Sequence, residues 1–265
     1  MKQRIISTVA LWAAIIAVVA LFRSWGGIAL LAAVTALAQI ELYNMLEYGG
    51  KARPMKILGV TLGVGVILAP HFLPTTGAME VPIIAVMILS LTLLKNNKVG
   101  QTFLPTLFPL VYLAFLLQFY GLILVQWGSL FLPIWVIAVA KFSDVGGLLV
   151  GKNFGRTKLA PEISPGKTIE GAAGGVLSSA IVGVVLALIF TKLTPFDMPI
   201  IKTAFAAAVI GVVAIVSDLI ESQLKRWAAL KDSGSIIPGI GGAFDLIDSM
   251  VLCGPVAFLL FKYLY

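Results

Sequence analysis

Long apolar segments constrain the fold of this chain more than any other feature of its sequence. Of the 265 residues, 60% are hydrophobic and only 12% are charged, and the mean hydropathy is +1.04. Soluble domains carry about 25% charged residues, so we expect lipid rather than water to surround most of these side chains. The sequence therefore predicts an all-α, polytopic transmembrane bundle of about nine helices. The expected helices cover residues 5–22, 27–46, 55–73, 81–95, 103–125, 129–150, 169–192, 201–228 and 245–264.

The distribution of basic residues predicts the orientation of this bundle. With the N-terminus in the cytoplasm, 15 of the 19 Lys and Arg residues fall on the inner side, as the positive-inside rule requires. The two longest polar loops, 151–168 and 229–244, are then cytoplasmic. The same bias accounts for the formal charge of +7, so this charge does not indicate nucleic-acid binding. The single cysteine, Cys253, excludes an intramolecular disulfide.

Acidic side chains gather at the cytoplasmic ends of three predicted helices. They are Asp144, Asp218, Glu221, Asp245 and Asp248. Asp218 and Glu221 are three residues apart and share a helix face, as do the two aspartates expected at the start of the last helix. Ionised carboxylates beside hydrocarbon are costly unless a positive partner joins them, and oxygen ligands favour Mg²⁺. The alternative is that these acids are helix caps and ion-pair partners of Lys225 and Arg226.

The two cytoplasmic loops combine basic residues with glycines. The loop before the last helix reads KDSGSIIPGIGG over 231–242, and the loop 151–168 reads GKNFGRTKLAPEISPGKT. Glycines let backbone N–H groups approach an anion closely, and Lys and Arg neutralise its charge. We expect Thr168 or Ser164 to cap the helix that follows. With a carboxylate-held cation, these loops predict a polyphosphate site. For loop 151–168, the alternative is a positive loop that contacts anionic lipid head groups.

Two stretches resemble a known enzyme family. Residues 217–249, SDLIESQLKRWAALKDSGSIIPGIGGAFDLIDS, resemble the signature of phosphatidate cytidylyltransferases, also called CDP-diacylglycerol synthases. Residues 142–171 are similar to a second block of that family. Upstream of these blocks, the resemblance is supported by the hydropathy pattern and by Glu41, near the inner end of the second predicted helix.

The resemblance implies an enzyme that transfers the cytidylyl group of CTP to phosphatidate, giving CDP-diacylglycerol and pyrophosphate with Mg²⁺. It implies a catalytic region over 101–265 and N-terminal transmembrane helices over 1–100, in a bacterial inner membrane with the site facing the cytoplasm. A homodimer is a further family expectation. The implied metal ligands are Asp218, Asp245 and Asp248, and the implied catalytic residues are Lys225, Arg226, Lys231 and Asp232. The implied substrate-binding residues are Asp144, Arg156, Ser164, Lys167, Ser222, Ser233, Gly234, Gly239, Gly241 and Gly242.

Two positions depart from the family signature. Ile240 stands where the family has His, and Leu246 stands where it has Arg. An imidazole could bind phosphate or carry a proton, and an Arg beside a polyphosphate can be worth roughly 10³-fold in rate. The alternatives to an active transferase are a diverged or inactive family member that keeps the fold, a CTP-dependent lipid or polyprenol kinase, and a transporter whose inner acids bind a cation.

Overall fold

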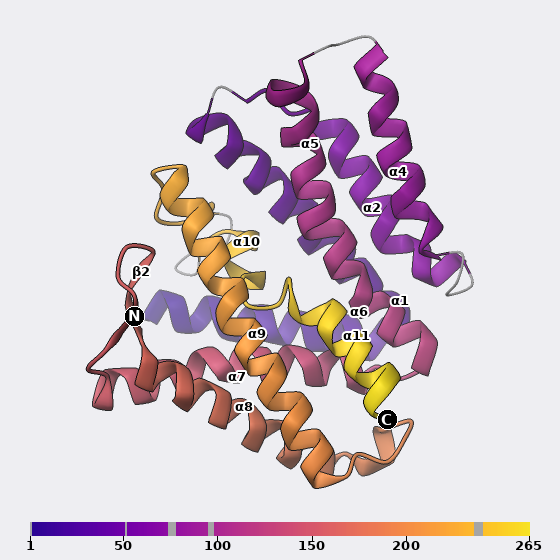
Figure 1. Ribbon diagram of the computed structural model, residues 1–265. Helices are drawn as coiled ribbons and strands as arrows, with labels where there is room; N and C mark the ends of the chain where they lie inside the picture. The colour runs from indigo at the N-terminus through magenta and orange to yellow at the C-terminus, as the bar shows by residue number, and fades with distance from the viewer. Residues whose placement is uncertain (1, 51, 74–77, 95–97, 236–240) are drawn as a thin grey trace. The chain divides into compact units, whose positions relative to one another are not determined.

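The structure is a computed structural model that describes residues 2–50, 52–73, 78–94, 98–235 and 241–265, with the backbone alone described for 2–16, 19 and 20. The chain forms two compact units (Figure 1). The first unit comprises Met1–Val125 and Lys225–Ile247, and the second comprises Gln126–Leu224 and Asp248–Tyr265. The boundary therefore passes through the chain three times, once inside the helix that carries Asp218 and once between Ile247 and Asp248.

The first unit is built from the helices that the apolar segments predict. Its helices are α1 (Lys2–Gly49), α2 (Lys56–Phe72), α4 (Glu80–Leu91) with the 3₁₀ turn η1 (Thr92–Leu94), then η2 (Val99–Phe103), α5 (Leu104–Pro109), η3 (Leu110–Phe115), α6 (Leu116–Trp127) and the short α10 (Ala243–Ile247). The break expected between the first two segments is at Arg23, whose φ of 49° and ψ of −127° interrupt α1. The π-helical turns η2 and η3 lie beside Pro105 and Pro109, which cannot donate the usual helical hydrogen bond.

Glycines bring α1 and α2 together in the first unit. A Cβ added at Gly59 would come within 2.7 Å of the Tyr43 ring, and one at Gly63 within 2.7 Å of the Gln39 amide carbon. Beside Gly59, the Tyr43 hydroxyl donates a hydrogen bond to the Thr106 carbonyl at 3.0 Å. Small residues on α2 therefore receive the large polar side chains of α1, as close packing in lipid requires.

The second unit contains long helices and one hairpin. Its elements are α7 (Phe131–Phe154), β1 (Lys158–Ala160), β2 (Ser164–Thr168), α8 (Ile169–Ile189), the 3₁₀ turn η4 (Thr191–Leu193), α9 (Ile200–Trp227, through Leu224) and α11 (Cys253–Leu264). Loop 151–168, expected to be irregular, begins with the last turn of α7 and continues into the antiparallel β1–β2 hairpin. The Thr168 side chain accepts from the Gly171 amide at 3.1 Å and caps α8, as predicted.

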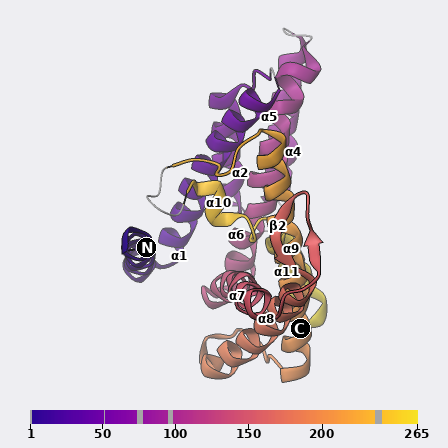
Figure 2. The same cartoon turned by 90° about the vertical axis from the view of Figure 1, so that its left-hand side faces the viewer.

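Close packing of α7 on α8 defines the core of the second unit (Figures 1 and 2). A Cβ added at Gly174 would come within 2.5 Å of Val150 Cβ, and one at Gly183 within 3.0 Å of the Trp135 ring. The fully buried Trp135 indole donates to the Gly183 carbonyl at 2.8 Å. Small residues of α8 thus serve helix packing.

The helix expected over 245–264 is wrong because the chain unwinds within it. Helix α10 ends at Ile247, and α11 begins only at Cys253. The Ser217 hydroxyl on α9 donates to the Asp248 carbonyl and accepts from the Leu252 amide at 3.5 Å, so side-chain bonds replace helical ones in the turn. Asp245 and Asp248 therefore do not share one face of one helix.

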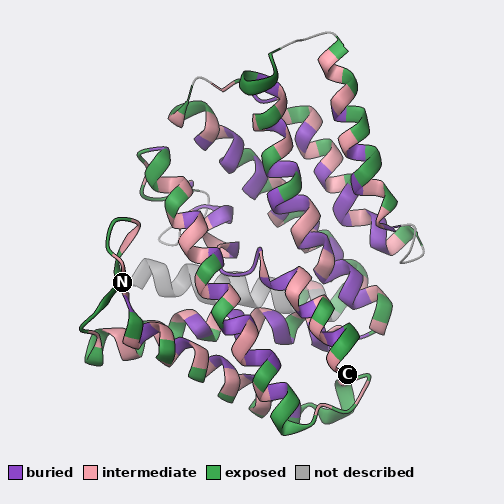
Figure 3. Cartoon of the chain, in the orientation of Figure 1, coloured by how far each residue is buried: buried purple, intermediate pink, exposed green. Residues whose placement is uncertain are grey.

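The exposed surface is apolar enough for lipid. Five helices of the described chain are long and apolar enough to cross a membrane, namely Leu21–Gly49, Val99–Trp127, Phe131–Phe154, Ile169–Ile189 and Ile200–Trp227. Large aliphatic side chains are exposed on these helices, including Leu148 on α7, Leu177 on α8 and Ile201 on α9. Figure 3 shows that exposed positions recur along the helices. The expectation of an all-α integral membrane protein is confirmed, whereas nine crossings and a cytoplasmic N-terminus stay predictions.

Candidate functional site

Three carboxylates meet in the second unit. Asp218 and Glu221 lie on one face of α9, as their spacing predicts, and Asp248 comes from the turn before α11. One oxygen of each lies within 4.8 Å of the others. Glu221 is fully buried, and the side chains of Asp218 and Asp248 are each 19% exposed. We call these three residues the acidic cluster.

Two lysines contact the acidic cluster. Lys167, at the end of β2, places its Nζ 2.7 Å from Asp218 Oδ2, and Lys141 of α7 places its Nζ 2.9 Å from Asp248 Oδ1. Lys141 Nζ also lies 3.8 Å from Asp144 Oδ2. The Ser222 hydroxyl donates to Asp218 Oδ1 at 3.3 Å. The structure therefore brings five predicted site residues together in one unit, namely Asp144, Lys167, Asp218, Ser222 and Asp248.

The acidic cluster has the chemistry of a hard-cation site. Its donors are all carboxylate oxygens, which Mg²⁺ prefers, and a divalent ion would offset the repulsion between three charges held this closely. Glu221 of the acidic cluster and Lys141, which contacts the cluster, are absent from the implied site residues. Their signal was visible in the sequence, because Glu221 follows Asp218 by three residues and Lys141 precedes Asp144 by three.

A second group of predicted residues lies in the first unit, around Asp245. Its Oδ2 accepts from the Ser233 amide at 2.9 Å and the Gly242 amide at 2.8 Å, and it lies 3.0 Å from the Ser233 hydroxyl oxygen. Its Oδ1 lies 2.9 Å from Lys225 Nζ. Burial acts to raise the pKa of the Asp245 carboxyl, but the hydrogen bonds from Gly242, Lys225 and Ser233 together hold this pKa below its usual value.

Glycines of the signature make room for carboxylates of the protein itself. A Cβ at Gly242 would come within 2.6 Å of Glu41 Cδ, one at Gly234 within 2.9 Å of the same atom, and one at Gly241 within 3.2 Å of Asp245 Cγ. Gly241 also has a φ of +123°, which side chains rarely adopt. These contacts give the three glycines a role in packing beside their predicted role in substrate binding.

The remaining predicted residues are dispersed. Arg226, Lys231 and Asp232 are exposed in the first unit, at the end of α9 and in the loop after it. In the second unit, Arg156 is exposed beside Glu170, which accepts from the Arg156 and Thr157 amides. Ser164 pairs with Ala160 in the hairpin. Leu246 is half-buried in α10, whereas Gly239 and Ile240 lie outside the described residues.

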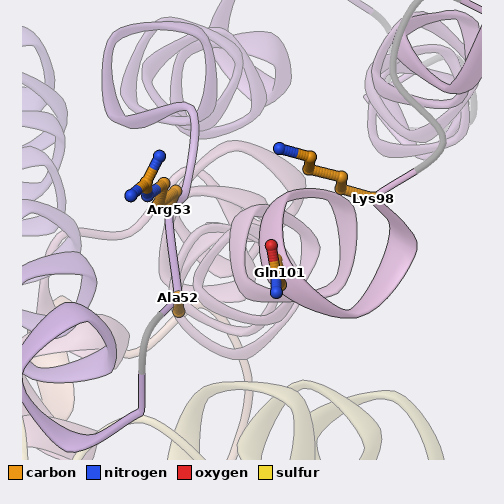
Figure 4. Close-up of a pocket in the computed structure, with 4 residues that line it drawn as sticks. All are labelled: Ala52, Arg53, Lys98 and Gln101. Carbon is orange, nitrogen blue, oxygen red and sulfur yellow. The ribbon is translucent and has the colours of Figure 1, made fainter.

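One surface pocket of the first unit is basic (Figure 4). It has a volume of about 320 Å³ and is lined by Ala52, Arg53, Lys98 and Gln101. The Arg53 amide donates to the Gln101 carbonyl at 2.6 Å and ties the segment before α2 to η2. No acidic residue lines this pocket among the described residues, and none of its residues belongs to the signature.

Comparison with known proteins agrees with these motifs. The sequence model of the cytidylyltransferase family matches residues 2–264. Phosphatidate cytidylyltransferase from Bacillus subtilis is 30% identical over 98% of this chain and 97% of its own length, and the Thermotoga maritima enzyme of that name is 29% identical over 89% and 88%. An uncharacterized Escherichia coli protein, YnbB, is 35% identical over 60% of this chain and 51% of its own length. The chain is therefore a member of the cytidylyltransferase family, and a nucleotidyltransferase of the membrane.

Proposed function

We propose that this protein transfers the cytidylyl group of CTP to phosphatidate, producing CDP-diacylglycerol for phospholipid synthesis. The observation that carries the proposal is the match over nearly the full length to a phosphatidate cytidylyltransferase, together with an acidic cluster contacted by lysines. Negative charges held beside positive ones, in an apolar bundle, suit a cation and the phosphates that it would neutralise.

The reaction joins a phosphate oxygen of the lipid to the α-phosphorus of CTP. The bond from that phosphorus to the oxygen bridging it to the β-phosphate breaks, and pyrophosphate leaves with the electron pair. Because the attacking oxygen is already ionised, the protein need not supply a base, and positioning and charge neutralisation remain its task. We assign phosphate binding to Lys141, Lys167 and Lys225, and extend it to Arg156, Arg226 and Lys231.

We assign the divalent cation, Mg²⁺, to Asp218, Glu221 and Asp248. When bound, the ion would neutralise charge on the triphosphate and polarise its phosphorus–oxygen bonds. As the family resemblance implies, Asp245 stays a proposed metal ligand and Asp232 a proposed catalytic residue. We further propose the bacterial inner membrane as the location, with about nine crossings, the N-terminus and the site facing the cytoplasm, residues 101–265 as the catalytic region, and a homodimer as the assembly.

Product analysis tests the proposal directly. Purified protein in detergent is supplied with radiolabelled CTP and phosphatidate, with and without Mg²⁺, and we expect labelled CDP-diacylglycerol and pyrophosphate only with the metal. Asp218→Asn should lower the rate by about 10²-fold or more. The matched control is Asp197→Asn, which makes the same change at an exposed position. CDP and a newly phosphorylated lipid would instead identify a kinase, and no product would refute the proposal.

A further inference from the structure

Glu41 is a carboxylate buried in an apolar helix. It lies on α1 with 4% of its surface exposed. Its Oε1 accepts from the Ala243 amide at 2.9 Å, and its Oε2 accepts from the Phe244 amide at 2.9 Å and from the Ser233 hydroxyl at 2.8 Å. No basic side chain of the described residues forms an ion pair with it. Burying an ionised group costs several kcal/mol, so three neutral donors must compensate this charge.

The three donors belong to the loop and short helix that carry the signature. Two are consecutive amides at the start of α10, and the third is a side chain 192 residues distant in sequence from Glu41. Glu41 therefore ties the N-terminal helix of the first unit to the segment 233–244 by three bonds. Gly234 and Gly242 lack side chains where this carboxylate packs, so the fit is reciprocal.

Ser233 extends this arrangement to Asp245. Its hydroxyl lies 2.8 Å from Glu41 Oε2 and 3.0 Å from Asp245 Oδ2, and its oxygen accepts from the Asp245 amide at 3.3 Å. Two backbone amides donate to Asp245 Oδ2 and the Ser233 hydroxyl oxygen packs against it, which fixes the rotation of the carboxylate and turns Oδ1 toward Lys225 Nζ. The orientation of one charged pair thus depends on a chain of contacts that begins at Glu41.

We propose that Glu41 is a positioning residue of the transferase, one that never touches substrate but fixes Ser233 and Asp245 so that Asp245 Oδ1 and the Lys225 ammonium are held ready for a triphosphate and its cation. This inference rests on the proposed function. It predicts a defect confined to the nucleotide side of the reaction, because the network contains no residue assigned to the lipid chains.

Glu41→Gln is the informative substitution because it keeps the size of the side chain. One carboxylate oxygen becomes an NH₂ group, which cannot accept from the amides of α10 or from Ser233. We expect kcat/KM for CTP to fall by about 10- to 100-fold, as outer-shell changes commonly do. The Mg²⁺ concentration for half-maximal rate should rise, and KM for phosphatidate should stay within about twofold. If Glu41 had a purely structural role, Glu41→Gln would lower the amount of folded protein without changing the kinetics for CTP and phosphatidate differently.

The matched control is Glu47→Gln on the same helix. Glu47 is 40% exposed and pairs with Lys56 at 2.6 Å, away from the signature. We expect its kinetics to equal those of the wild type. Ser233→Ala combined with Glu41→Gln should cost less than the sum of the single changes, because both act through one chain of contacts.

A second readout does not depend on turnover. Hydrogen–deuterium exchange of the Ala243 and Phe244 amides should be faster in Glu41→Gln than in the wild type and in Glu47→Gln. Wild-type exchange and wild-type CTP kinetics in Glu41→Gln would overturn the inference while leaving the proposed function standing. A wild-type protein that forms no CDP-diacylglycerol would refute the proposed function instead, and exchange would still report whether Glu41 orders the loop.

Discussion

Replacing Gly242 with Ala tests the packing of the signature against Glu41. The added Cβ would lie within 2.6 Å of Glu41 Cδ, whereas carbon atoms pack at about 3.5–4.0 Å. The carboxylate must therefore withdraw by roughly 1 Å or the loop must move as far. Either shift lengthens hydrogen bonds of 2.8–2.9 Å beyond the range in which they count as bonds.

The expected loss follows from those bonds. A hydrogen bond to a charged acceptor contributes about 1.5–3 kcal/mol, so losing two of the three bonds to Glu41 should lower the free energy of unfolding by about 3–6 kcal/mol. Gly242 does not have a positive φ, so its backbone conformation is open to Ala. The expected loss of stability therefore comes from the steric clash and not from backbone strain. A Gly→Ala change without a clash stabilises by about 0.4–1 kcal/mol, which is opposite in sign.

Equilibrium unfolding in detergent measures this difference. Gly166→Ala in β2 is the control, because a Cβ there meets nothing within 4 Å. Glu41→Ala should relieve part of the penalty of Gly242→Ala when the two are combined, since the clashing carboxylate is then absent while the clash of the added Cβ with Ser233 Oγ remains. The reasoning is refuted if Gly242→Ala unfolds within about 0.5 kcal/mol of Gly166→Ala, or if the two penalties simply add.

Three further predictions test other parts of the structure. The pKa of Asp245 is lowered in the folded chain, so its ionised form stabilises the fold above its unfolded pKa of about 3.9 and loses that effect as the pH falls through the lower, folded pKa. The stability gap between wild type and Asp245→Asn should therefore be constant from about pH 6 to 8 and shrink only below about pH 4; a change between pH 6 and 8 would contradict this assignment. Trp135→Phe should cost about 1–3 kcal/mol in unfolding experiments because the buried Gly183 carbonyl loses its donor, whereas Trp127→Phe, which removes an indole with ring contacts to Phe258 and Phe261, should cost less. Cys253 is fully buried, so a thiol reagent should label it only after denaturation, while an introduced Gly166→Cys on the hairpin should react at once; rapid labelling of the native wild type would show that Cys253 is accessible.

Most of the fold could be predicted from the apolar segments and from the residues that separate them. Runs of apolar residues gave α2, α7, α8 and α9 to within a few residues, because an apolar segment in lipid has little choice but helix. The break after Ile247 could not be predicted in this way. It depends on the Ser217 hydroxyl, which lies about 30 residues away in sequence and pairs with the turn only in the folded chain. The hairpin over 158–168 was equally hidden, since its residues carry no alternating apolar and polar pattern.

The candidate site likewise combines features that local sequence predicts with contacts that form only in the folded chain. Local spacing placed Asp218 and Glu221 on one face of α9, because both lie in one helix. The partners of the acids came from tertiary contacts instead. Of the expected ion-pair alternatives, Lys225 does pair with Asp245, but Asp218 pairs with Lys167 and Asp248 with Lys141, over 51 and 107 residues of sequence. The contact of Glu41 with Ser233 spans 192 residues and has no local signal at all.

The hydroxyl of Ser217 behaves in the turn after Ile247 as a single solvent molecule would in a soluble protein. It donates a hydrogen bond to one backbone oxygen and accepts one from a backbone nitrogen. The side chain thus satisfies backbone groups of an unwound segment that is buried away from water. Because these two backbone groups are paired, the chain can bend here without leaving them unsatisfied. The bend in turn lets the Asp248 side chain point toward α9.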